Sequence, residues 1–140
     1  MKIDITVLAN ILEAFLEAEK PSITLDYILN KSGFKLSDDK FIFHYRLIIE
    51  NLLVSDELFR TGNNESAGLL HDRSDTYSVI PGHKIRLTQK GHDLALSLNN
   101  REVLAKLKSE LKDAPFKTIF DGSQKLLQHY FKKKIDALTE

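Results

Sequence analysis

The stretch from Lys84 to Leu98, KIRLTQKGHDLALSL, constrains the fold more than any other part of the sequence. Residues 84–87 read as a short strand, and a helical pattern of leucines follows directly after it. Thr88 is a good N-cap for that helix, because its hydroxyl can accept an amide hydrogen bond in the first turn. Gly91 is unusual at this place, since glycine costs about 1 kcal/mol inside a helix. We therefore expect another segment of backbone to pass close to Gly91.

The composition is typical of one globular domain without disulfides. The chain has 140 residues, of which 42% are hydrophobic and 29% charged, so it can form a core and is not expected to be disordered. The formal net charge is zero, which removes the simplest argument for nucleic-acid binding but leaves room for a local basic patch. The absence of cysteine excludes disulfides, thiolate catalysis and cysteine-based zinc sites.

The first twenty residues do not read as a signal peptide. Asp4 and Glu13 interrupt the apolar run, and no small-residue cleavage site follows it. No apolar run approaches the length of a membrane span. The expectation is a cytoplasmic protein with no membrane partner.

Apolar residues at helical spacing predict five long helices and one short one. The long helices are expected at residues 3–18, 38–53, 89–99, 101–112 and 115–138. The segment Ser22–Gly33 is expected to start as a strand and continue as a short helix, with Gly33 as a left-handed C-cap. Ser37 is expected to cap the second long helix, and Pro115 to be the first residue of the last one. That last helix could be kinked or broken at Gly122.

The region between the second and third long helices predicts a small β structure. Residues 54–61 alternate weakly like a strand, and residues 62–68 form a turn-rich loop. Residues 76–80 are strand-like, and Pro81-Gly82 is a strong turn signal before the strand at residues 84–87. We expect two or three strands here, joined by a loop.

Three short motifs resemble a known group of proteins. They are Phe43-His44 with Leu47 and Ile48, then Arg86-Leu87-Thr88-Gln89-Lys90-Gly91-His92, and finally Lys132-Lys133-Lys134. The middle motif resembles the exit of the wing in regulators of the MarR and PadR type. All three together resemble an uncharacterised winged-helix family of small bacterial and prophage proteins. That family usually has a tryptophan where Val103 stands, and it has no established activity, so the resemblance implies a fold and an origin in a phage or mobile element.

The expected fold class is therefore α+β, mainly α. The resemblance implies a winged helix-turn-helix with a small β wing and a C-terminal helical hairpin. Residues 1–100 would form the winged-helix domain, and residues 101–140 a helical extension packed on it as part of one compact unit.

The first functional hypothesis is the binding of double-stranded DNA. In a winged helix the helix at residues 38–53 would enter the major groove, and the wing would contact the backbone. The candidate DNA-binding residues are Lys40, His44, Arg46 and Asn51 on that helix, and Arg73, Lys84 and Arg86 in the wing. Asp38 and Asp39 argue against this hypothesis, because carboxylates at the approaching end of the helix repel phosphate.

The second hypothesis is a protein-interaction or oligomerisation module that binds no DNA. The last helix carries more large apolar residues than one helix needs in order to pack on a small domain. The candidate interface residues are Phe116, Phe120, Leu127, Tyr130 and Phe131. A homodimer would bury them, and so would a host protein bound by a phage protein; a partner-binding role also fits the neutral net charge.

Nothing in the sequence predicts an enzyme. The five histidines are scattered, no two have the i, i+4 spacing of a helical metal site, and no glycine-rich phosphate loop is present. We therefore expect no catalytic residues, no metal and no cofactor.

Overall fold

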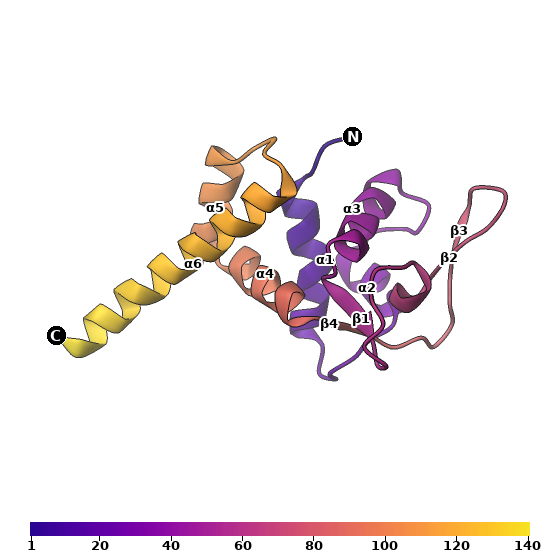
Figure 1. Cartoon of the computed structure of the whole chain (residues 1–140), viewed down its shortest axis with the longest axis horizontal. Coiled ribbons are helices and arrows are strands. Elements are labelled where there is room, and N and C mark those ends of the chain that lie inside the picture. Colours follow the sequence, from indigo (N-terminus) through magenta and orange to yellow (C-terminus); the bar gives the residue numbers. More distant parts are fainter.

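Six α-helices form where apolar residues recur at helical spacing, and they make the structure mainly helical within the α+β class (Figure 1). The computed structural model describes all 140 residues. The helices are α1 (Ile5–Glu17), α2 (Leu25–Ser32), α3 (Asp39–Glu50), α4 (Gln89–Asn99), α5 (Arg101–Glu110) and α6 (Phe116–Thr139). None of them is long and apolar enough to span a membrane.

Helix α1 is the centre of the core. Its residues Leu8, Ile11 and Leu12 are fully buried, and the helix contacts α2, α3, α4 and α5 (Figure 1). The buried apolar side chains of all six helices and of β1, β2 and β4 join in one cluster. Burial of this apolar surface is the main stabilising contribution to the fold.

A small sheet lies beside this helical core. Strand β1 (Val54–Asp56) pairs antiparallel with β4 (Ile85–Leu87). Ile23 lies on the other side of β4, where its N–H donates to the Ile85 carbonyl at 2.8 Å and its carbonyl accepts the Ile85 N–H at 2.7 Å. The expectation that Ser22–Gly33 starts extended and continues as a helix is thus confirmed.

The predicted strand at residues 54–61 is shorter than expected and ends at Asp56. The Asp56 carboxylate accepts the backbone N–H groups of Leu58 and Arg60 at 2.9 and 3.0 Å, which turns the chain away from the sheet. After the 3-10 turn η1 (Glu65–Ala67), strands β2 (Leu69–His71) and β3 (Tyr77–Val79) form a separate hairpin. This hairpin projects from the body of the molecule (Figure 1).

The ends of α2 and α3 follow the sequence signals only in part. Gly33 is the left-handed C-cap of α2, as expected, with a φ of 79°. The expectation that Ser37 caps α3 was wrong, because Asp38 occupies the N-cap position and α3 begins at Asp39. The Asp38 carboxylate instead accepts the backbone N–H of Lys35 at 3.0 Å.

The junction before α4 confirms the expectation for Thr88 and Gly91. The Thr88 hydroxyl oxygen accepts the N–H of Gly91 at 3.0 Å and donates to the Leu52 carbonyl at 2.7 Å. A β-carbon at residue 91 would overlap the carbonyl oxygen of Leu53. This junction therefore fixes the start of α4 against the end of α3.

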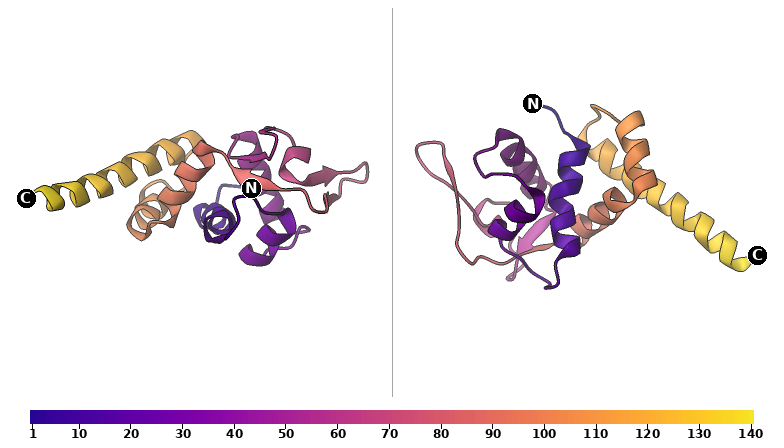
Figure 2. Two further views of the ribbon diagram at one scale, coloured as in Figure 1. Left: turned by 90° about the horizontal axis from the view of Figure 1, so that it is seen from below. Right: turned by 180° about the vertical axis from the view of Figure 1, so that it is seen from behind.

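Helix α6 is continuous from Phe116 to Thr139 and is not broken at Gly122. Pro115 takes the N-cap position, one residue earlier than expected. The first half of α6 packs against α4 and α5, whereas the second half projects from the body (Figure 2).

Candidate nucleic-acid and protein interaction surfaces

Arg46 is an expected DNA-binding residue of α3 that lies on the surface. Its Nη1 donates a hydrogen bond to the Tyr77 hydroxyl at 3.1 Å, and its guanidinium lies 6.0 Å from the centre of that ring. The Tyr77 ring in turn stacks on His71 with the ring centres 4.5 Å apart. Arg46 therefore joins the exposed side of α3 to the β2–β3 hairpin.

His44 does not lie on the exposed face of α3, and the expectation that it does was wrong. Its side chain is fully buried. Its Nε2 accepts the backbone N–H of Asp4 at 2.8 Å, and its Nδ1 donates to the Lys40 carbonyl at 2.7 Å. Burial lowers the pKa of His44, and the ring is neutral in this arrangement. His44 holds the start of α1 against α3.

Lys40 and Asn51 are both engaged within the protein. The Lys40 ammonium lies 3.3 Å from a carboxylate oxygen of Asp4. The Asn51 amide donates to the Leu47 carbonyl at 2.9 Å, where it closes the end of α3. Neither side chain is fully available to a nucleic acid in this arrangement.

The exposed charges of α3 and its N-cap are more acidic than basic. Asp38, Asp39 and Glu50 are exposed, as are Lys40 and Arg46, which makes three carboxylates against two cations. This surface therefore does not attract phosphate by its net charge.

Arg86 is bound within the protein, whereas Arg73 and Lys84 are free. The Arg86 Nη1 donates to the Ser55 hydroxyl at 3.2 Å, and the guanidinium lies 4.9 Å from the centre of the Phe59 ring. Arg73 lies in the tip of the hairpin, and Lys84 lies just before β4. Both are exposed, and neither takes part in an ion pair.

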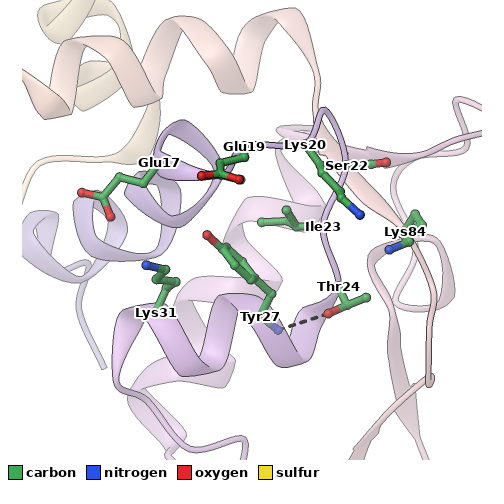
Figure 3. Close-up of a pocket in the computed structure, with 10 residues that line it drawn as sticks. Glu17, Glu19, Lys20, Ser22, Ile23, Thr24, Tyr27, Lys31 and Lys84 are labelled. Atoms are coloured by element: carbon green, nitrogen blue, oxygen red, sulfur yellow. Dashed lines mark hydrogen bonds between the residues drawn. The ribbon is translucent and has the colours of Figure 1, made fainter.

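Lys84 lines a groove with two lysines that the sequence reasoning missed, Lys20 and Lys31 (Figure 3). The groove has a volume of about 450 Å³ and lies between the end of α1 and one side of α2. None of the three lysines has an ion-pair partner, although Glu17 and Glu19 line the same groove. No signal in the sequence links the three positions, because only the fold brings them together.

The expected interface residues of α6 are covered to different degrees. Phe116, Phe120, Leu127 and Tyr130 are half-buried, and the Lys90 ammonium lies 5.1 Å from the centre of the Phe120 ring. Phe131 is 53% exposed. Ile135 and Leu138, which the sequence reasoning did not single out, are also exposed. We name Leu127, Phe131, Ile135 and Leu138 the α6 stripe.

No group of three or more His, Asp or Glu side chains is placed to hold a metal ion. Comparison with protein-family models, with curated proteins and with solved structures found no match to this chain.

Proposed function

We propose that this chain is a winged-helix protein that binds double-stranded DNA, chiefly through the phosphates. The order of its elements supports this proposal. Three helices precede β1 in the chain. In the sheet, β4 lies between Ile23 and β1, and the β2–β3 hairpin comes between β1 and β4 in the sequence. In a winged helix this order presents α3 and the hairpin to one duplex.

The observation that carries the proposal is the groove between the end of α1 and α2. Lys20, Lys31 and Lys84 bring three ammonium groups to it, and no carboxylate forms an ion pair with any of them. Lys20 and Lys84 lie at one end of the groove, and Lys31 lies at the other end beside Glu17 (Figure 3). Lys20 and Lys84 together suit a phosphate group, since binding there releases counterions from the nucleic acid. Arg73 would add a further contact from the tip of the hairpin.

Arg46 is the side chain best placed to read bases. Only one of its nitrogens is used by the Tyr77 hydroxyl, so the others remain able to donate to guanine. The carboxylates of Asp38, Asp39 and Glu50 lie on or beside the same helix and would oppose close approach. We therefore expect binding with a weak preference between sequences.

The second candidate function is a protein-interaction module that binds no DNA. The excess of carboxylates on the exposed side of α3 favours it, because this is the helix that a DNA-binding winged helix presents to the groove. The DNA-binding proposal predicts that the chain binds duplex DNA in the absence of any other protein, whereas the interaction module predicts no such binding.

Titration of a labelled random-sequence duplex with the full chain at low salt tests the proposal. We expect binding that weakens with salt, with a slope of about −0.9 for each phosphate neutralised. Lys20→Glu with Lys84→Glu should abolish most of it. The matched control reverses two exposed lysines in and just after α5 that do not line the groove, Lys108→Glu with Lys112→Glu, and should change the affinity little. The absence of binding at low salt would contradict the proposal and favour the interaction module.

A further inference from the structure

The α6 stripe continues the side of the helix that is covered by α4 in its first half. The Gln124 amide donates to the Asp93 carbonyl at 3.1 Å, and Lys90 lies over the Phe120 ring, so this side of α6 faces α4. Beyond Leu127 the same side has no neighbour, and Phe131, Ile135 and Leu138 are 53%, 58% and 84% exposed. The stripe thus lies on the α4 side of α6, in the half of the helix that projects from the body and leaves an open angle beside it (Figure 2).

We propose that the α6 stripe binds a helix of another protein that has an apolar face and acidic flanks. This inference is independent of DNA binding, because it concerns a different surface. Three features of the molecule support it: the shape of the open angle, the charge of the projecting half of α6, and the length of the stripe.

The shape excludes a flat partner. A helix with its side chains is about 10 Å across, and α4 lies on the same side of α6 as the stripe. A membrane surface that approached the stripe would meet α4 before it reached Phe131. A single helix is narrow enough to lie along the stripe within the angle.

The charge disfavours a second copy of this chain. From Gln124 to Glu140 the chain carries four lysines and two carboxylates, which gives a net charge of +2. Lys132 and Lys134 lie on the two sides of Phe131, because successive helical residues are about 100° apart around the axis. Two copies packed stripe to stripe would bring these lysines together, whereas glutamates on the flanks of a partner helix would pair with them.

The length sets the size of the partner. Leu127 and Leu138 are eleven residues apart, which corresponds to about 16 Å along the axis. About three turns of a partner helix would cover this length. Such a contact is small beside a standard interface, so we expect a weak and reversible complex.

Two designed peptides test the proposal by fluorescence anisotropy with the full chain. Both have leucines at i, i+3, i+4 and i+7 and the same length; one carries glutamates beside the leucines, the other lysines. We expect the glutamate peptide to bind at least tenfold more tightly than the lysine peptide. Phe131→Asp should weaken this binding tenfold or more. The matched control His129→Asp adds the same carboxylate on the opposite side of α6 and should weaken it less than twofold.

Three outcomes would overturn the proposal. One is equal or absent binding of the two peptides. Another is a dimer of the free chain in light scattering that Phe131→Asp dissociates, because a second copy would then cover the stripe. The third is binding to vesicles rich in phosphatidylserine that the same substitution abolishes. Phe131 is half-exposed, so the variant should fold, and an unchanged thermal unfolding midpoint verifies this.

Discussion

Gly91 packs directly against the carbonyl group of Leu53, so closely that a β-carbon at residue 91 would overlap the oxygen atom. The same Leu53 carbonyl accepts the backbone N–H of Thr88 at 2.9 Å. The first turn of α4 is therefore joined to the segment that connects α3 to β1. A side chain at residue 91 would force the first turn of α4 away from the segment between α3 and β1.

The first prediction follows from this contact. Gly91→Ala should destabilise the protein by about 3 kcal/mol or more, because the new methyl group meets backbone that cannot move aside. Gly122→Ala is the matched control within a helix. Its β-carbon would meet the end of the Leu111 side chain, which can rotate away, so we expect a change below about 1 kcal/mol. Urea unfolding of the wild type and the two variants measures both changes in the free energy of unfolding. Equal destabilisation by the two substitutions would contradict the backbone contact.

The second prediction concerns pH and His44. Burial lowers the pKa of His44 in the folded protein below its ordinary value of 6.5, so the unfolded chain binds a proton more readily. Its contribution to stability is therefore complete above that value and is lost as the pH falls below it. We expect the free energy of unfolding to decrease between pH 7 and pH 5. His44→Gln should be less stable at pH 7 and should show a smaller decrease; an identical pH dependence would exclude His44 as its source.

The third prediction concerns the buried carboxylate of Asp56. It accepts two backbone N–H groups and the Nε of Arg60, the last at 2.7 Å. Asp56→Ala leaves these donors without an acceptor and should destabilise the protein by about 3 kcal/mol. Asp136→Ala, at an exposed position of α6, should change stability by less than about 0.5 kcal/mol. Thermal or urea unfolding distinguishes the two, and a neutral Asp56→Ala would show that the turn forms without this carboxylate.

The fourth prediction separates the two kinds of DNA contact. Lys84→Ala should weaken binding to all duplexes alike, because a phosphate contact carries no sequence information. Arg46→Ala should instead reduce the difference between preferred and random duplexes, by about 1–3 kcal/mol if it reads a base. Asp39→Asn should tighten binding, because it removes a carboxylate from the exposed end of α3. Competition titrations at fixed salt measure all three, and a tightening by Lys84→Ala would exclude the proposed groove contact.

The sequence by itself determined the features that depend on residues close together in the chain. The helices, the Gly33 C-cap and the Thr88 N-cap all rest on spacing or on hydrogen bonds within one turn. Even the close approach at Gly91 could be expected, because glycine destabilises a helix and is therefore expected there only where a side chain would not fit.

Only the tertiary structure decided which of the polar residues are free to meet a partner. His44 is a polar residue between Phe43 and Tyr45, yet its side chain is buried and accepts a hydrogen bond from the backbone of Asp4. Lys20 and Lys84 are far apart in the chain, and the pairing of Ile23 with β4 brings them to one groove. The exposure of Phe131 depends on where α4 and α5 end beside α6. These properties depend on contacts between distant segments, and spacing along the chain carries no information about them.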